Sequence, residues 1–409
     1  MNDNHIILIF GDKWHLMSLQ NKGFKVTNIL LKETYAFKDP SSDTFMLSES
    51  TIVLENIKHL EAYVSLLCKI HNIKAIISLT DTNDGVYHAH YLSQKFNIGN
   101  PTQINPLKSV EILKNKGLTR KHLEDHGINS IPYKIVSSSE EAIAFFKEHN
   151  SSFILKPLDS QGSQYVNKVG SIDEIERYFK RIELSNILME AYIEGQEFSV
   201  EAVSFKGKHH ILGITEKQIL GHNDFGHNTY VEKGHTFPAP ILEKDKQSIE
   251  NYVKTLLGSL EIKSGPSHTE IKLTTQGPIL IESHLRPGGD LIPRLIKIST
   301  NLDIFSLAVE SYCKETLSLD TIEKKLEASI CFLTPKPGKI NDIIIPESLK
   351  NNPEIYKLNL KKKIGDTISI ITETKTRNVG YIVVKGDQNT YEKANDYINT
   401  VKIKTSNIK

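Results

Sequence analysis

Glu270 and Glu282 are the two side chains whose spacing best suits the binding of a divalent cation. The segment HTEIKLTTQGPILIE reads as two strands joined by a turn at residues 275–277. If this hairpin is centred on Gln276, the two carboxylates lie directly opposite each other and repel unless a cation compensates. The same alternation predicts a buried face that carries Ile271, Leu273, Ile279 and Ile281. The alternative for the two acids is an exposed pair on a solvated face.

Arg286, Gly288 and Gly289 follow the second acid directly, in the segment IESHLRPGGD. A guanidinium presents a fork of donors to phosphate or carboxylate oxygens and keeps its charge. Two glycines let the backbone approach a ligand closely and can present their N–H groups to it. Taken singly, Arg286 could form a surface salt bridge, and the two glycines could form a plain turn. Taken together after a strand carboxylate, they favour a phosphate or carboxylate site beside the predicted metal.

Lys156 ends an apolar strand in the segment FILKPLDSQGSQYV and precedes a loop that contains Gly162 and Ser163. A lysine with a Gly/Ser loop can bind and cover phosphates. The pattern GxxxxGK[ST] is absent, so a P-loop fold is disfavoured. Downstream, the segment LMEAYIEGQEFSVE contains Glu190 and Glu197, with a crossover between them that can offer backbone groups to an adenine edge and a carboxylate to ribose.

The elements that must position these residues fall into three stretches. A chain of 409 residues exceeds the usual limit of one core, so two or three domains are expected. The first hundred residues alternate strands, such as HIILIFG and KAIISLTD, with helices, which predicts a parallel sheet. A basic helix follows Asn100-Pro101, and a strand-rich region extends from about 130 to about 300. The last ninety residues contain antiparallel strands and a terminal helix.

Composition excludes several classes of protein. With 50 basic and 49 acidic side chains, bulk charge predicts no affinity for nucleic acid or membrane. Three scattered cysteines, Cys68, Cys313 and Cys331, predict no disulfide framework. No apolar run is long enough to span a bilayer, and the N-terminal apolar stretch reads as a buried strand, not as a signal peptide. We therefore expect a cytoplasmic protein.

The order of these motifs resembles the ATP-grasp superfamily of carboxylate–amine ligases, over nearly the whole chain. The motifs that carry the resemblance are Lys116, Lys156-Pro157, Gly162-Ser163, MEAYIEGQE, HTE and IESHLRPGG. Within the superfamily, RPGGDLIPRL, VEKGHTFPAP, PKPGKI and RNVGYIVVKG are similar to L-amino acid ligases that make dipeptides, of the bacilysin-synthesis type or the arginine-selective rhizocticin type. The resemblance implies an α/β fold. Its parts would be a Rossmann-like domain (1–105), a two-lobed ATP-grasp core (106–310, lid about 130–195) and a small antiparallel C-terminal lobe (311–409).

The resemblance also implies a role for each motif. ATP would be bound by Lys116, Lys156, Gly162, Ser163, Glu190 and Glu197 and by the backbone at Tyr192 and Ile193. Magnesium, for which manganese can substitute, would be held by Glu270 and Glu282, with His284 where many relatives have asparagine. Arg286 would steady the acyl phosphate, with Lys156, Gly288 and Gly289 as the other catalytic groups. Tyr165 stands where many relatives have glycine, at the tip of the phosphate loop.

The segment ITEKQILGHNDFGHNTYVEKGHTFP is the expected wall of an amino-acid pocket. Its histidines, His222, His227 and His235, match no structural zinc pattern, so loop residues or substrate contacts are the better interpretation. The expected substrate contacts are Glu232, His235, Arg286, Gly289 and Asp290. For a cationic substrate, Glu232, Asp224 and Asp290 are the candidate counter-charges.

The expected reaction is ATP-driven ligation of two L-amino acids through an acyl phosphate, by a homodimer that serves antibiotic biosynthesis, with arginine as the candidate for the first amino acid. Catalysis would rest on positioning and on neutralisation of spread negative charge. Two alternatives stay open: an ATP-grasp ligase of another carboxylate with an amine, and a nucleotide-binding module without catalysis. A third alternative, an NAD-dependent oxidoreductase, is supported only by the N-terminal α/β pattern, and we rank it last.

Overall fold

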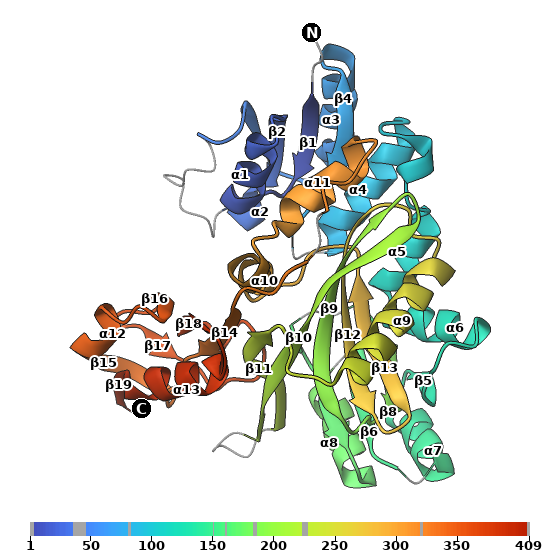
Figure 1. Ribbon diagram of the computed structural model, residues 1–409. Coiled ribbons are helices and arrows are strands. Elements are labelled where there is room, and N and C mark those ends of the chain that lie inside the picture. The colour runs from blue at the N-terminus through green and yellow to red at the C-terminus, as the bar shows by residue number, and fades with distance from the viewer. Residues whose placement is uncertain are drawn as a thin grey trace.

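The computed structural model describes residues 4–35, 46–80, 83–149, 151–159, 162–182, 186–222, 228–319 and 322–406. Helices and strands are mixed throughout these residues, and the strands form four sheets (Figure 1). The predicted α/β class is confirmed. None of the described helices is long and apolar enough to cross a membrane. The three cysteines are free thiols, as expected.

The N-terminal sheet is parallel and has the strand order β3-β2-β1-β4. Its strands are β1 (His5–Ile9), β2 (Lys25–Leu31), β3 (Ser50–Leu54) and β4 (Ile73–Ile77), and its connections contain α1 (Lys13–Asn21), α2 (Lys32–Tyr35), η1 (Ile57–His59), α3 (Leu60–Ile70) and α4 (Asn83–Lys95). Both predicted strands, HIILIFG and KAIISLTD, are present. Every residue of β1 is buried, which accounts for its unbroken apolar run.

A late helix completes this N-terminal layer. Ala308 and Val309 of α11 (Ile304–Cys313) pack into the cluster that contains Ile6, Leu8 and Leu16. Figure 1 shows α11, in orange, beside β1 and α4. The chain thus returns to its first sheet after building the central part, a long-range contact that local periodicity does not indicate.

Residues 101–125 contain η2 (Pro101–Gln103), α5 (Leu107–Lys114) and α6 (Lys116–Asp125). The prediction of one basic helix here is wrong, because Asn115 interrupts it. The Asn115 side chain accepts a hydrogen bond from the backbone N–H of Leu118 and so caps a new helix. The break places Lys116 in the first turn of α6.

A small antiparallel sheet carries the predicted phosphate lysine. Its order is β5-β8-β6-β7, formed by β5 (Tyr133–Val136), β6 (Phe153–Pro157), β7 (Asn167–Val169) and β8 (Ile187–Ala191). Two helices, α7 (Ser139–His149) and α8 (Ile172–Arg181), cover it through a cluster that includes Phe145, Phe153 and Tyr178. The other face of β6 and β8 contributes Lys156 and Glu190 to the site.

A large sheet of eight strands joins the central part to the last ninety residues. Its order is β13-β12-β9-β10-β11-β14-β18-β16. The strands are β9 (Gln196–Phe205), β10 (Lys208–His222), β11 (Asn228–Phe237), β12 (Gly265–Thr274), β13 (Gly277–His284), β14 (Glu327–Phe332), β16 (Ile355–Leu360) and β18 (Gly380–Gly386). The junction is β11 with β14, where Gly234 pairs with Cys331. A Cβ on Gly234 would lie 2.4 Å from the carbonyl oxygen of Ile330, so the close approach needs glycine.

Helices pack on both ends of this large sheet. α9 (Glu243–Ser259) buries Ile249, Val253 and Leu256 against β9 and β12, and α10 (Ile292–Thr300) packs on β11 and β14. The remaining elements are α12 (Glu347–Lys350), α13 (Thr390–Thr400) and an antiparallel sheet of order β17-β15-β19, formed by β15 (Gly338–Ile344), β17 (Thr367–Ile368) and β19 (Lys402–Ser406). The last ninety residues therefore extend the large sheet as well as adding a small antiparallel one.

Candidate active site

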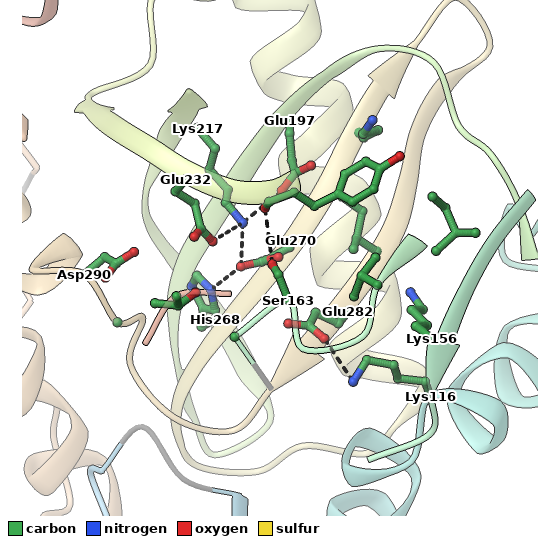
Figure 2. A pocket seen from close by; sticks show the side chains of 18 of the residues that line it. Lys116, Lys156, Ser163, Glu197, Lys217, Glu232, His268, Glu270, Glu282 and Asp290 are labelled. Atoms are coloured by element: carbon green, nitrogen blue, oxygen red, sulfur yellow. Dashed lines mark hydrogen bonds and ion pairs between the residues drawn. The ribbon is translucent and has the colours of Figure 1, made fainter. Parts of the chain in front are cut away.

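One cavity of about 350 Å³ brings together most of the predicted site residues. Its lining comes from α6, from the small sheet and from the large sheet (Figure 2). The predicted residues that line it are Lys116, Lys156, Gly162, Ser163, Glu190, Tyr192, Ile193, Glu197, Glu232, His235, Glu270, Glu282, Arg286, Gly289 and Asp290. Gly288 and His284 line other cavities.

Glu270 and Glu282 face each other across β12 and β13, as predicted. The turn is not centred on Gln276 as expected, because Thr274 pairs with Gly277. A bulge between Glu270 and Ile271 shifts the register by one residue, so that Glu270 again lies opposite Glu282. The bulge also changes the predicted buried face. Ile271 and Leu280 enter the core, whereas Ile281 lines the cavity.

Both carboxylates are held in the ionised form. Burial alone would raise the pKa of Glu270, but the Lys217 ammonium and His268 lower that pKa to about 2. Burial acts in the same way on Glu282, and Lys116, 3.4 Å from its Oε2, holds the pKa of Glu282 well below its ordinary value. Two adjacent negative charges therefore face the cavity at neutral pH.

This pair fits a magnesium ion that arrives with a nucleotide. Magnesium takes one or two protein carboxylates and completes its shell with water and substrate phosphates. Within the described residues, no group of three or more His, Cys, Asp or Glu side chains is arranged to hold a metal by itself. His284 lies beside Glu282, with 3.3 Å between Nε2 and Oε1, but it is buried and faces a separate small cavity. Burial, and then Arg286, lower the pKa of His284.

Lys217 is the central cation of the site, and the sequence patterns did not single it out. It lies on β10 with 3% of its side chain exposed, and its Nζ is 2.8 Å from Glu270, 2.9 Å from Glu197 and 3.3 Å from Glu232. Figure 2 shows it between these three carboxylates. Burial would lower its pKa, but the three neighbours together raise the pKa of Lys217 well above its ordinary value. The sequence signal that could have identified Lys217 is a lysine at a position where a strand is expected to be buried, because a buried lysine is almost always paired.

Lys156 is also paired, with Glu190. Lys156 Nζ lies 2.5 Å from Glu190 Oε1, and Arg120 Nε lies 2.8 Å from Oε2, with all three side chains 5% exposed or less. Burial lowers the pKa of Lys156, against the effect of Glu190. Burial would raise the pKa of Glu190, but Arg120 and Lys156 lower it. Both oxygens of Glu190, the expected adenine contact, are therefore engaged by cations.

The predicted phosphate loop lies against the large sheet and the C-terminal part. The Ser163 hydroxyl donates to the carbonyl of Tyr230 (3.2 Å), and the Thr374 N–H donates to the carbonyl of Gly162 (3.1 Å). Gly162, Ser163 and Tyr165 all have φ near +60°. Tyr165 thus adopts the left-handed conformation that glycine adopts most easily.

The expected adenine segment between β8 and β9 borders the cavity. The Tyr192 N–H donates to the carbonyl of Ser152 (2.9 Å), and the Ile193 carbonyl accepts from Lys272 (3.0 Å). The Tyr192 ring also lies under Lys168 and Lys272, at 3.6 and 5.0 Å from its centroid. These two backbone groups and the Tyr192 ring therefore already have partners within the chain at the rim of the cavity.

The glycine pair after Arg286 has two different environments. The Gly288 N–H donates to Oε2 of the fully buried Glu201 (3.0 Å), and a Cβ on Gly288 would lie 2.7 Å from Glu201 and 2.8 Å from His268. Glu201 also bonds His268, whose pKa would fall on burial but rises to about 9 because of this carboxylate and Glu270. Gly288 therefore serves close packing, while Gly289 has open space and lines the cavity.

Asp290 and Glu232, the candidate counter-charges for a cationic substrate, are already paired. Arg377, from the segment before β18, binds both oxygens of Asp290 at 2.6 and 2.7 Å and the carbonyl of Glu232 at 2.6 Å. Its guanidinium stacks 3.6 Å from the Phe332 ring centroid. Burial would raise the pKa of Asp290, but Arg377 and then His235 hold that pKa well below its usual range.

The expected wall of the amino-acid pocket is only partly covered by the residues that the structure describes. Asp224 and His227 lie outside the described residues, and His222 is described only as the end of β10. His235 is buried, with Nε2 3.4 Å from Asp290. Arg120, Glu201 and Arg377 were missed by the sequence analysis, because their partners lie at least 67 residues away along the chain.

Comparisons with known proteins identify a family for part of the chain. Residues 149–293 match the family model of the ATP-grasp domain. The chain is 35% identical to a D-alanine–D-alanine ligase of Flavobacterium psychrophilum over 33% of this chain and 42% of the relative. It is 25% identical to an alanine–anticapsin ligase of Bacillus subtilis over 51% of this chain and 48% of the relative. The chain thus spans about half or less of the length of these two relatives.

Among solved structures, an L-amino acid ligase from Bacillus licheniformis superposes with a TM-score of 0.81. The alignment covers 100% of both chains at 20% sequence identity, so the likeness establishes the fold. The expected resemblance to the ATP-grasp superfamily is confirmed by the match of residues 149–293 to the ATP-grasp domain model.

Proposed function

We propose that this protein is an ATP-dependent carboxylate–amine ligase that joins two L-amino acids into a dipeptide and releases ADP and phosphate. The observation that carries the proposal is the facing pair Glu270 and Glu282, ionised and bordered by Lys116, Lys156 and Arg286 around one cavity. The names of the D-alanine–D-alanine ligase and L-amino acid ligase relatives support the choice of amino-acid substrates.

In the first step, a carboxylate oxygen of one amino acid attacks the γ-phosphorus of ATP. An O–P bond forms, the bond to the bridging β–γ oxygen breaks, and ADP leaves. Lys116 and Lys156 bind phosphate oxygens and offset the charge that spreads over them in the transition state. Glu270 and Glu282 would hold magnesium, or manganese in its place, which supplies further charge neutralisation to the phosphates when bound.

In the second step, the amine of the other amino acid attacks the acyl carbon, a C–N bond forms and the bond from that carbon to the phosphate oxygen breaks. Phosphate leaves with the proton that the amine loses. Arg286 borders the same cavity and can bind the phosphoryl oxygens of the acyl phosphate through its forked donors. The loop at Gly162 and Ser163, which bonds Tyr230 and Thr374, covers the site and excludes water from the hydrolysis-prone intermediate.

Glu190 and Lys217 act as positioning residues in this proposal. Glu190 fixes Lys156 through their 2.5 Å ion pair. Lys217 fixes Glu270 and the expected ribose ligand Glu197 in one geometry. Arginine as first amino acid gains no support from Asp290 or Glu232, because Arg377 already neutralises them.

The test is phosphate release from ATP and magnesium with each single L-amino acid and then each pair, with products identified by mass. The proposal predicts phosphate and a dipeptide for particular pairs. Phosphate release only with a carboxylate that is not an amino acid would keep the ligase class and remove the dipeptide assignment. Nucleotide binding without turnover across the panel would favour a non-catalytic nucleotide-binding module.

A further inference from the structure

A second cavity, of about 520 Å³, lies on the other side of the loop that contains Gly289 and Asp290. These two residues line both cavities, so the loop is the boundary between them. The second cavity is bordered by α1, by the segment that follows β4, by α10 and by strands β16 and β18. Figure 1 shows α10 between the N-terminal layer and the C-terminal strands.

Aromatic and apolar side chains form much of this second cavity: Phe10, Trp14, Met17, Phe305, Tyr356 and Tyr381. The acidic groups in its lining have internal roles. Asp12 caps α1, Asp303 binds Lys297 at 2.8 Å, and Asp290 is held by Arg377. Such a lining can bind a ligand that has an apolar part. The ligand need not be a cation, because the acidic side chains of the lining already have partners within the chain.

Arg294 is the charged group whose donors remain available in this cavity. Its guanidinium carbon lies over the Trp14 ring, 4.0 Å from the ring centroid, a cation–π contact that holds the guanidinium at this wall of the cavity. No acidic side chain in the described part of the chain forms an ion pair with it. Lys357 also lines the cavity, but it is exposed and stays hydrated. A planar, half-buried guanidinium of this kind recognises a carboxylate through two parallel hydrogen bonds.

We propose that the second cavity binds the amine substrate of the ligation: an L-amino acid whose α-carboxylate pairs with Arg294 and whose apolar side chain packs on Trp14. This inference rests on the proposed function. The amine of that substrate reaches the acyl phosphate across the boundary at Gly289 and Asp290. The first cavity thus holds the carboxylate of the acyl donor, which is activated by ATP. The second cavity holds the carboxylate of the amine substrate, which only binds Arg294.

Trp14 reports occupancy directly, because it is the single tryptophan of the chain. Its fluorescence, excited where tyrosine does not absorb, is titrated with L-amino acids that carry apolar side chains and with their α-amides. We expect a saturable change with the free amino acids and binding about 10- to 100-fold weaker with the amides, which lack the carboxylate charge.

The decisive variant is Arg294→Met, compared with Arg177→Met, which replaces an exposed arginine on α8. We expect Arg294→Met to weaken amino-acid binding and to raise KM for the amine substrate by about 10- to 100-fold, while amide binding is unchanged. Hydroxylamine, an amine without a carboxylate, should still trap the acyl phosphate at the wild-type rate. Arg177→Met should match the wild type in every assay.

The outcomes separate the two proposals. A fluorescence change that Arg294→Met weakens, in a protein that ligates no amino acids, supports the carboxylate site and overturns the proposed function. Dipeptide synthesis with unchanged KM values in Arg294→Met, and no response of Trp14, overturns the site and leaves the function. A rise in KM for the acyl donor, with loss of hydroxamate formation, overturns the assignment of the cavity to the amine substrate.

Discussion

At the scale of the residue, the site is a set of buried charges that neutralise one another. Lys156 and Glu282 were predicted from their places at strand ends, Glu270 from its register opposite Glu282, and Lys116 from the resemblance alone. The sequence analysis missed Lys217, Arg120 and Arg377, whose roles depend on partners brought close by folding. The alternation of apolar and polar residues could have identified Lys217 as a charge at a buried strand position, but it could not have identified the partners of that charge.

Substitution of Lys217 by methionine tests this charge balance. The variant leaves Glu197, Glu232 and Glu270 together without their shared cation. We expect the free energy of unfolding to fall by about 3–5 kcal/mol, because a buried pair loses one partner. Lys180→Met is the control, since Lys180 is 78% exposed in an i,i+4 pair and should cost less than about 1 kcal/mol. Equal stability of the two variants in urea unfolding would contradict this view of Lys217.

The pH dependence of stability tests the buried pair of Glu201 and His268. The pKa of His268 in the folded protein is about 9, above its ordinary 6.5. The stabilisation from its charge is therefore fully present below about pH 6.5 and is lost as pH rises through about 9, roughly 3 kcal/mol at most. Glu201→Gln removes the first of the charges that raise this pKa. The unfolding free energy of the variant should have a shallower slope between pH 6.5 and 9, because Glu270 still raises the pKa of His268, and an identical slope in both proteins would contradict the assignment.

At the scale of the element, a bulge and a close contact position the facing carboxylates Glu270 and Glu282 and the arginine loop. The hairpin and the opposition of Glu270 and Glu282 were predicted correctly, but the bulge beside Ile271 was not, and Ile281 changed face as a result. A single inserted residue shifts every side chain beyond it, and the sequence alternation in this hairpin is too short to locate such a shift. The division of residues 106–128 into two helices likewise depends on one capping asparagine.

The two glycines of the arginine loop provide a matched pair of variants. Gly288→Ala places a Cβ 2.7 Å from Glu201 and 2.8 Å from His268, whereas Gly289→Ala meets no atom within 4 Å. We expect Gly288→Ala to lower the free energy of unfolding by about 1–3 kcal/mol through overpacking. Gly289→Ala should change it by less than about 0.5 kcal/mol. Thermal unfolding of both variants decides, and a Gly288→Ala protein as stable as Gly289→Ala would show that the contact relaxes freely.

At the scale of the whole molecule, the large sheet links the predicted core to the predicted C-terminal lobe. The α/β class was visible in the order of strands and helices, but the pairing of β11 with β14 and the return of α11 to the first sheet were not. Such pairings are set by tertiary packing between segments about a hundred to three hundred residues apart, which local patterns do not encode.

A chain that ends at residue 310 tests this continuity. Its truncation leaves β11 as an open edge and uncovers Leu295 and Ile296, which pack on β14 and β18. It also removes Arg377 from Asp290. We expect the shortened protein to aggregate or to unfold without a cooperative transition. Cooperative thermal unfolding together with nucleotide binding by residues 1–310 would show that the central part folds independently.

The central claim, ligation through an acyl phosphate at the facing carboxylates, is tested most directly by following oxygen. The acyl-donor amino acid is supplied with ¹⁸O in its carboxylate, together with ATP, magnesium and the amine substrate. We predict that the released phosphate carries one ¹⁸O atom and that the dipeptide keeps the other. Dipeptide accompanied by unlabelled phosphate, or by AMP and pyrophosphate, would contradict the account.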